Sequence, residues 1–526
     1  MSEKTGQVSV GEKRERPKER RPGRLVTVFK AVVLLALVAV TAYGMLNRGL
    51  YAEELWLPVA AGVLALMVAT LLVRGYYQDV PRIGWALAAL MGALVGIKGL
   101  SLLWTVSKIE TLQELLRSSM YLAAFLMALA ALASWRQVGP TMDAAVLVVT
   151  ALAGYGLLQK TSPLQFPISS VDDVSVDSTL DYSNTLATVL GIGVALALAR
   201  LTQSRNVAAR GLLAALILAF LATLYLTASR GGIASLGVAV ILMVVLSNYR
   251  LQMAANLLLV SVPGGWLIWR MQDLGALWQS EAPDAQKLAA GVELRNDLVI
   301  SLVAAFALQC GYAILVRRYD LTSLARRAIG GAFLAAVAVA VLGGALLIVG
   351  QYGGVGKAYD AVLSDPQGDE SARQRLASLS IGFREDYWKV AWEEWKEHPL
   401  MGTGAGTFPY TWLRERPVDA SVKQVHNLYL EQGTETGLFA FLTLVGFSGL
   451  LVGYTVRETW RSSGHRRLLL SGLVAAMVIY LLSSVIEWHW YLPPSTLFFF
   501  VLSAVAVKLA SWKEWDPPGK ASEERG

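Results

Sequence analysis

The chain has little charge, almost no cysteine and few histidines, and these shortages exclude several classes of protein. Only 16% of its 526 residues are charged, against about 25% in an ordinary soluble domain. The single cysteine, Cys310, excludes an intramolecular disulfide and therefore a disulfide scaffold. The 55% of hydrophobic residues and the mean hydropathy of +0.49 exclude a disordered chain and a typical nucleic-acid binder. This composition is typical of a membrane protein.

The sequence contains many long apolar runs. A helix needs about 20 mostly apolar residues to cross the hydrocarbon core, and such runs are helical because lipid offers no partner for open backbone groups. The sequence predicts an all-α polytopic membrane protein of about 14 transmembrane helices with one large, mainly helical extracytoplasmic loop. The predicted spans lie near residues 25–46, 55–73, 83–104, 119–134, 141–159, 182–199, 209–226, 232–247, 253–269, 297–316, 328–350, 433–455, 468–486 and 494–511.

The distribution of lysine and arginine predicts the orientation. With the N-terminus inside, the short inner loops carry more of these residues than the outer loops, and the basic stretch 13–24 agrees. No small-residue cleavage site follows the first span, so we expect an uncleaved anchor rather than a signal peptide. Both termini are therefore predicted to be cytoplasmic.

The predicted organisation has five parts. These are a disordered basic cytoplasmic tail (1–24), transmembrane helices 1–11 (25–350), a large periplasmic or extracytoplasmic loop (351–432), transmembrane helices 12–14 (433–511) and a cytoplasmic tail (512–526). Loops as long as 351–432 usually carry function or are disordered. The helical pattern of this loop favours function.

Residues 373–398 of the loop have the periodicity of an amphipathic helix. One arc of this helix holds Phe383, Tyr387, Trp388, Ala391, Trp392 and Trp395. A helix on the membrane interface or over the spans is the ordinary explanation of such an arc. Arg384 falls near the middle of the arc. It is either a snorkelling or ion-paired side chain, with Glu394 as a partner, or a guanidinium aimed at an anion such as phosphate.

A glycine run follows this helix, with Gly402, Gly404 and Gly406 in the segment HPLMGTGAGTFPY. The spacing superficially suggests a nucleotide loop. No βαβ unit surrounds it, however, and the segment is predicted to lie outside the cell. We expect a turn that lets backbone approach a ligand or a helix.

His426 is the best catalytic candidate among the four histidines. Histidine is the usual general base near neutral pH. His465 lies beside two arginines in an inner loop, His489 lies in the aromatic stretch EWHWYLPP, and His398 ends the amphipathic helix. His426, followed by Asn427, lies just before a span, at the predicted outer boundary. Its position alone leaves the role open.

Arg230 is a second arginine predicted at the same level. It lies in TLYLTASRGG, where Gly231 and Gly232 are expected to reverse the chain between two spans. An ionisable group at such a junction is a functional candidate, and snorkelling is the alternative. In the predicted topology Arg230, Arg384 and His426 share one side of the membrane. This is the set that chemistry with a phosphate leaving group needs.

With these residues the chain resembles the bacterial O-antigen ligase and O-antigen polymerase family of lipid-linked glycan transferases. The matching segments, in family order, are residues 101–122, 180–199, 226–232 (LTASRGG), 383–408 and 426–438 (HNLYLEQGTETGL). The resemblance implies an inverting, metal-independent glycosyltransferase without a cofactor. Its donor is a glycan on undecaprenyl diphosphate at the outer leaflet of the bacterial cytoplasmic (inner) membrane. A ligase passes the glycan to lipid A–core, and a polymerase passes it to another lipid-linked repeat unit.

The resemblance also implies residue roles and partners. Arg230 and Arg384 hold the diphosphate, where fixed guanidinium groups stabilise the leaving charge, and His426 activates or orients the acceptor hydroxyl. Glu435 is a candidate for orienting His426 or the acceptor, and Asn427 and Asn184 are further supporting candidates. The partners are the lipid-linked glycan, lipid A–core or another glycan acceptor, and membrane lipids, without nucleic acid. The alternative of another class is a polytopic transporter or lipid flippase, whose repeated halves or paired broken helices the sequence does not show.

Overall fold

A computed structural model describes residues 23–170, 172–318 and 382–512, together with a few positions between 331 and 357. Within these residues the regular structure is entirely helical, which confirms the predicted all-α class. The predicted span 328–350, most of the segment 351–381 and almost all of both tails lie outside the described residues.

Twelve described helices are long and apolar enough to cross a membrane. They are α1 (Arg24–Leu46), α2 (Glu53–Leu72), α3 (Arg82–Leu100), α4 (Lys108–Ala131), α5 (Val138–Thr161), α6 (Ser183–Gln203), α7 (Val207–Leu226), α9 (Arg250–Asp273), α10 (Asp284–Arg318), α16 (Leu428–Arg461), α17 (Gly464–Ser483) and α18 (Pro493–Ser511). The apolar helix α8 (Arg230–Leu246) is shorter. Every predicted span that lies within the described residues therefore has its helix.

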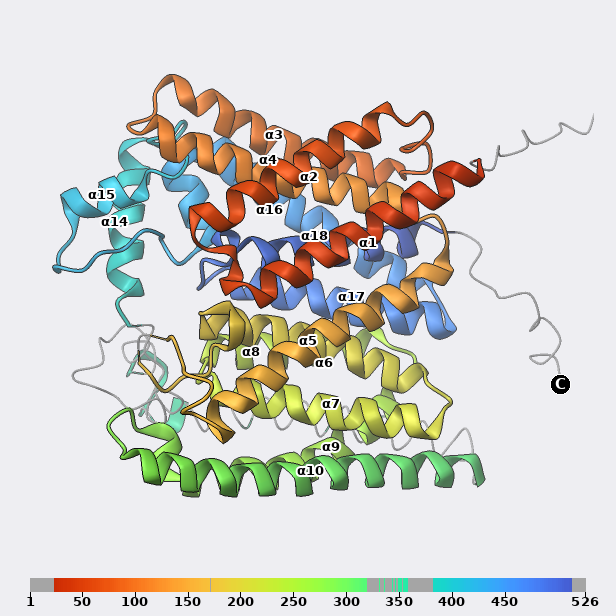
Figure 1. Ribbon diagram of the computed structural model, residues 1–526. Coiled ribbons are helices and arrows are strands. Elements are labelled where there is room, and N and C mark those ends of the chain that lie inside the picture. Colours follow the sequence, from red (N-terminus) through yellow and green to blue (C-terminus); the bar gives the residue numbers. More distant parts are fainter. Residues whose placement is uncertain are drawn as a thin grey trace, which may run out of the picture.

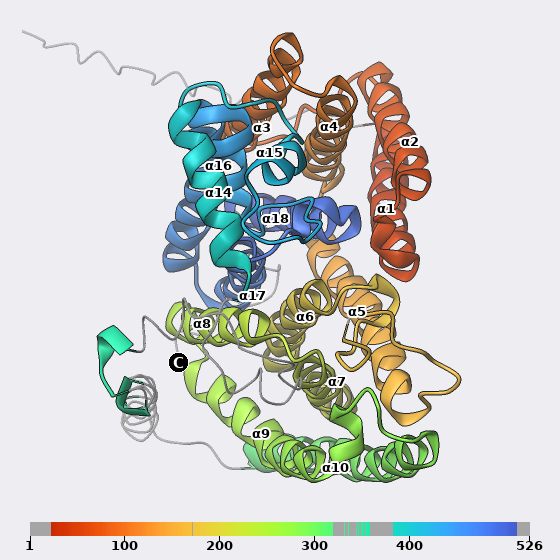
Figure 2. The ribbon, with the colours of Figure 1, turned by 90° about the vertical axis from the view of Figure 1, so that its left-hand side faces the viewer.

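The long helices lie side by side in two groups (Figures 1 and 2). One group holds α1–α4, α16 and α18, the other holds α5–α10, and α17 packs between them against α6, α8 and α18. The apolar windows of α6 and α18 are 94% buried, whereas those of α2 and α10 are only 22% buried. The central helices thus form the core, and the peripheral ones keep apolar faces for lipid.

Both described chain ends lie at the end of the bundle opposite α14 (Arg384–Glu397) and α15 (Phe408–Glu415) (Figure 1). There the ammonium of Lys30 lies 2.6 Å from the carboxylate of Asp79, and Lys508 donates to the Asp79 carbonyl at 2.8 Å. These contacts join α1, the α2–α3 connection and α18. We call the other end of the bundle the α14 end.

The helix α4 begins earlier than the sequence indicates. Residues 108–118, expected to be an outer loop, form its first turns, because the predicted span at 119–134 covers only its apolar part. The buried charged residues Glu114 and Arg117 lie in this extension, where they pair with each other. This extension of α4 borders the α14 end.

The helix α16 is kinked where it leaves the membrane-spanning part. Gly437 has φ 78° and ψ −175°, and a Cβ there would lie 2.1 Å from the carbonyl oxygen of Leu400. Only glycine fits this close approach. The segment before the kink, which begins at Leu428, packs beside α14 (Figure 2).

The helix α14 buries a narrower stripe than the aromatic arc predicts. Ala391 and Glu394 are buried, whereas Phe383 and Trp392 are about half exposed. Glu394 turns inward because it pairs with Arg414 of α15. The amphipathic helix is therefore present, but its buried face is set by this polar contact as well as by aromatic rings.

Candidate active site

The carboxylate of Glu487 lies at the centre of a polar cluster at the α14 end. This residue belongs to the connection between α17 and α18, and only 6% of its side chain is exposed. One carboxylate oxygen pairs with Arg384 at 2.5 Å. The other accepts a hydrogen bond from the hydroxyl of Tyr182 and lies 3.9 Å from Nδ1 of His426. Three separate segments thus meet at one acidic group.

Arg384 is held by two neighbouring residues of the α17–α18 connection. Its Nε donates to the carbonyl of Ile486 at 2.9 Å, and its Nη2 pairs with Glu487. The partner suggested by the sequence, Glu394, pairs with Arg414 instead, so that expectation was wrong. Burial is the largest single influence on the pKa of Arg384 and lowers it, but Glu487, Tyr182 and Tyr387 together outweigh burial and raise the pKa. The guanidinium is therefore firmly charged and fixed in direction.

His426 occupies a strained position at the entrance to α16. Its φ is 58°, in the left-handed region that non-glycine residues rarely adopt, and such strain clusters at functional sites. The next residue, Asn427, begins the helix: its side-chain oxygen accepts from the backbone N–H groups of Tyr429 and Leu430, both at 3.1 Å. Asn427 is therefore an N-cap that fixes the position of His426.

The imidazole of His426 lies between aromatic rings. The ring centroids of Tyr387 and Trp488 lie 5.5 and 6.2 Å from its own. Nδ1 has no hydrogen-bond partner among the described residues. Burial, and then the charges of Arg384 and His489, lower the pKa of His426 well below its usual value. The ring is therefore neutral at neutral pH and able to accept a proton.

Arg230 begins α8, next to the same connection. A Cβ at the following residue, Gly231, would lie 2.2 Å from the side chain of Ile486, whose carbonyl binds Arg384. Arg230 thus lies one residue from this contact. The expected reversal at the glycines was wrong: Ala228, with φ 53°, makes the turn, and the glycines belong to the first turn of α8.

The supporting candidates have different places. The amide of Asn184 donates to the hydroxyl of Tyr182 at 3.2 Å, and Tyr182 in turn donates to Glu487. Glu435 is not the partner of His426. Its carboxylate accepts from the backbone N–H groups of Gly406 (2.8 Å) and Phe408 (3.1 Å), and so holds the glycine run at the start of α15.

The glycine run approaches a helix, one of the two outcomes expected. Gly404 has φ 115°, and a Cβ there would lie 2.1 Å from the hydroxyl oxygen of Thr105, just before α4. Its N–H donates to the backbone carbonyl of Glu435 at 2.7 Å. The run therefore fastens the segment between α14 and α15 to α4 and α16.

The other histidines lie apart from this arrangement. His489 is buried and its ring nitrogens lie 2.8 and 3.0 Å from the hydroxyls of Thr185 and Thr188. His398 follows the last turn of α14 with 53% of its side chain exposed, and His465 stacks on Tyr249. Of the four histidines, all of which lie within the described residues, His426 is the one whose ring lies within ion-pair distance of Glu487.

Sequence reasoning missed Glu487 and Trp488. Both lie in EWHWYLPP, a stretch whose composition is typical of the aromatic belt at a membrane interface. The overlooked signal was the acidic residue itself, because an ionisable group at the end of an apolar span is a functional candidate.

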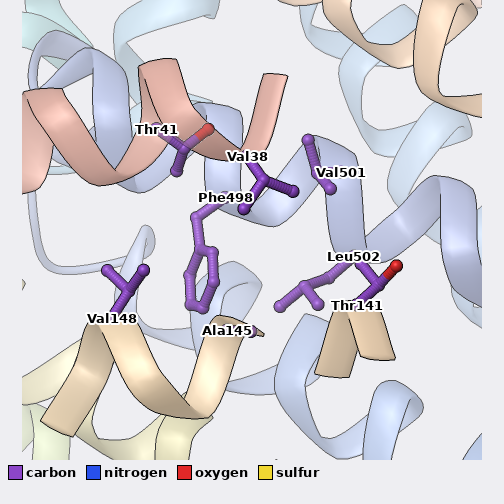
Figure 3. Close-up of a pocket in the computed structure, with 8 residues that line it drawn as sticks. All are labelled: Val38, Thr41, Thr141, Ala145, Val148, Phe498, Val501 and Leu502. Carbon is purple, nitrogen blue, oxygen red and sulfur yellow. The ribbon is translucent and has the colours of Figure 1, made fainter. Parts of the chain in front are cut away.

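A small apolar crevice elsewhere carries no chemistry. It lies between α1, α5 and α18 (Figure 3) and holds about 20 Å³. Its two hydroxyl groups, on Thr41 and Thr141, donate to carbonyls of their own helices. It is a packing gap within the bundle.

One comparison with known families matches a part of the chain that contains several of these residues. Residues 298–445 match a family model described as O-antigen ligase, a stretch that includes Arg384, His426 and Glu435 but not Arg230 or Glu487. No curated protein matches the chain. The family supports a membrane glycosyltransferase-like ligase or polymerase activity. The chain is a multi-pass membrane protein in which residues 298–445 are similar to the O-antigen ligase family model.

Proposed function

We propose that the chain is an inverting, metal-independent glycosyltransferase that moves a glycan from undecaprenyl diphosphate to an acceptor hydroxyl. In the ligase form of this reaction the acceptor is a sugar of lipid A–core, and transfer takes place on the outer face of the inner membrane. The observation that carries the proposal is the convergence of Arg384 and His426 on Glu487, at one end of a bundle of membrane-spanning helices.

The arginines act on the leaving group. Negative charge builds on the diphosphate as its bond to the sugar breaks, and a guanidinium held in place stabilises that charge without reorganising. Nε and Nη2 of Arg384 bind the Ile486 carbonyl and Glu487, and these contacts fix the planar guanidinium in direction before the donor arrives. Its positive charge attracts phosphate oxygens. Arg230, beside Ile486 through Gly231, adds the second positive charge.

His426 acts on the acceptor. The neutral imidazole takes the proton of the acceptor hydroxyl as its oxygen attacks the anomeric carbon from the side opposite the diphosphate. The bond from that carbon to the diphosphate breaks, its electron pair leaves with the phosphate oxygen, and the configuration inverts. The imidazolium then faces the Glu487 carboxylate, 3.9 Å away, and catalytic hydrogen bonds of this length often tighten when substrate binds.

Donor binding strengthens the base. The charge of Arg384 is one cause of the lowered pKa of His426. A bound diphosphate offsets that charge, so the pKa of His426 rises when the donor is present. The base is therefore weak in the empty site and stronger in the complex that reacts.

The proposed orientation places the α14 end outside. The opposite end carries both described chain ends and, in its connections, Arg74, Arg136 and Arg205. Basic residues are enriched in cytoplasmic loops, which supports this orientation. The polyprenyl tail of the donor then lies along the lipid-facing helices.

The same site serves a polymerase, whose acceptor is a second lipid-linked repeat unit. A transfer assay with purified protein, glycosyl undecaprenyl diphosphate and two acceptors separates these reactions. A lipid A–core product indicates a ligase, and a lengthened lipid-linked glycan indicates a polymerase. Absence of both products, with intact binding of the donor, contradicts the proposed function.

A further inference from the structure

A cavity larger than the crevice of Figure 3 opens at the α14 end, beside the Glu487 cluster. It holds about 610 Å³, within the range of about 300–1,000 Å³ that is usual for ligand sites. Its walls come from the start of α2, the extension of α4, the glycine run with α15, and the segment before His426. The lining includes Tyr51, Trp56, Glu110, Arg117, Tyr410 and Tyr491.

The cavity begins one aromatic ring away from His426. Tyr51, which lines the cavity, contacts Trp488 edge-on with ring centroids 5.3 Å apart. Trp488 in turn lies 6.2 Å from the ring of His426. The ring of Trp488 thus lies between the cavity wall and the proposed base, in contact with both.

Aromatic side chains make the walls suitable for sugar rings. Tyr51 and Tyr410 are 42% and 45% exposed, so their rings are accessible to a ligand in the cavity. Deeper in the wall, the guanidinium of Arg117 lies 4.5 Å from the ring of Trp56 and 4.9 Å from that of Tyr491. Such mixed apolar and polar surfaces bind polyhydroxylated ligands by contact with rings and by hydrogen bonds.

Two buried donors in this wall lack partners. Nε1 of Trp56, a residue with no exposed surface, and Nε of Arg117, a residue that is 6% exposed, make no hydrogen bond to any described residue. An unsatisfied buried donor is costly, so ligand hydroxyls that reach this wall gain a favourable bond.

The charge of the cavity selects among sugars. Four carboxylates line it, on Glu53, Glu54, Glu110 and Glu114, against two basic groups, on Arg117 and Lys423. Arg117 is already paired with Glu114. The surplus of negative charge repels phosphate and carboxylate groups and accepts hydrogen bonds from sugar hydroxyls.

We propose that this cavity is the acceptor subsite and that it takes uncharged or amino sugars in preference to phosphorylated ones. The inference rests on the proposed function, since it supplies the hydroxyl that His426 deprotonates. The sugars of the acceptor that enter the cavity are then free of phosphate, whatever charge the acceptor carries elsewhere.

Binding of a probe tests the cavity independently of turnover. Chitotriose and its 6-phosphorylated form are titrated against the full chain in nanodiscs, with saturation-transfer NMR as the readout. We expect chitotriose to bind at least about tenfold more tightly. Trp56→Phe keeps the ring but removes the donor and should weaken chitotriose about tenfold, the effect of one hydrogen bond of about 1.4 kcal/mol. Equal or tighter binding of the phosphorylated sugar, or no specific binding of either, overturns the proposal.

Matched variants test whether the carboxylates cause the preference for the unphosphorylated sugar. The combination of Glu53→Gln, Glu54→Gln and Glu110→Gln should remove most of the preference, whereas Glu281→Gln, at an exposed acidic residue in the α9–α10 connection, should keep it. In the transfer assay, Trp56→Phe should raise the KM for acceptor and leave the KM for donor unchanged. Sugar binding without any transfer would count against the proposed function alone, and transfer without sugar binding at this cavity counts against the subsite alone.

Discussion

Nδ1 of His426 lies 3.9 Å from a carboxylate oxygen of Glu487, while the other oxygen of the same group pairs with Arg384. One carboxylate therefore couples the proposed base to the proposed phosphate-binding group. The two arrive on different segments, the start of α16 and the start of α14, and their meeting point belongs to a third. The predictions below test this coupling and the geometry that supports it.

Replacing the imidazole should abolish transfer. His426→Ala removes the group that takes the acceptor proton, and loss of a positioned base typically costs about 10²–10⁴-fold in rate. The measurement is the initial rate of glycan transfer by purified protein. His398→Ala, at the exposed histidine after α14, is the control and should keep the full rate. Comparable rates for both variants contradict the role of His426.

Arg384 and Glu487 should be thermodynamically coupled. Removing one partner leaves the other charge poorly solvated, which costs about 3–5 kcal/mol for a buried pair, whereas removing both relieves that penalty. Thermal or denaturant unfolding of Arg384→Ala, Glu487→Ala and the double variant measures the coupling. The double variant should be less destabilised than the sum of the single variants. Additive losses would show that the pair is not coupled.

Transfer should persist into mildly acidic solution. The pKa of His426 is lowered below its usual value of about 6.5, so the neutral base dominates at pH 6.5 and above. Activity should therefore fall only as pH decreases through the lowered pKa. The profile of kcat/KM, which reports the free enzyme, is the measurement. An acid limb at pH 7 or above contradicts a neutral, desolvated His426.

Acidification should also lower the folding stability of the protein. His426 binds fewer protons in the folded state than in the unfolded state once pH falls below about 6.5, so acidification favours unfolding. His426→Gln removes this titration, and its stability should depend less on pH below about 6.5. A wild-type and variant pair with parallel profiles would rule out a depressed pKa.

The glycine run should tolerate no side chain at Gly404. Its φ of 115° and the 2.1 Å approach of a Cβ to Thr105 predict a loss of more than about 2 kcal/mol in Gly404→Ala. Gly96→Ala is the matched control, because it lies in α3 with no atom within 4 Å of the added Cβ. Thermal unfolding in detergent measures both. Equal stability of the two variants contradicts the close docking of this run.

Labelling should place the α14 end outside. In a Cys310→Ser background, Asp419→Cys should react with a membrane-impermeant maleimide in intact cells, since 91% of that side chain is exposed. Arg205→Cys, exposed at the opposite end, should react only after the membrane is opened. The reverse pattern overturns the proposed orientation.

The helices were largely predictable from sequence, and the contacts between them were not. Apolar runs predicted every described span because a bilayer imposes length and composition on each segment separately. The start of α4 was not predicted, because its polar first turns are buried by tertiary contacts that a run of hydropathy does not reveal.

The sequence predicted Arg384 and His426 as site residues, but it did not predict which side chains they contact. Arg384 and His426 stood out because each is a rare polar group in an apolar or boundary position. Their shared partner Glu487 lies far along the chain, and no spacing rule connects it to either. Glu394 and Glu435 were closer in sequence and therefore more obvious, yet each is occupied by other contacts, with Arg414 and with the backbone of the glycine run.

The location of Glu487 has a mechanical consequence. It connects α17 and α18, which belong to the bundle interior, whereas Arg384 belongs to α14, outside the spans. A displacement of α14 that breaks the Arg384–Glu487 pair would therefore leave α17 and α18 in place, but it would also shift Trp395 against Phe441 of α16. Capture and release of an anionic headgroup at this pair then need no motion of α17 or α18.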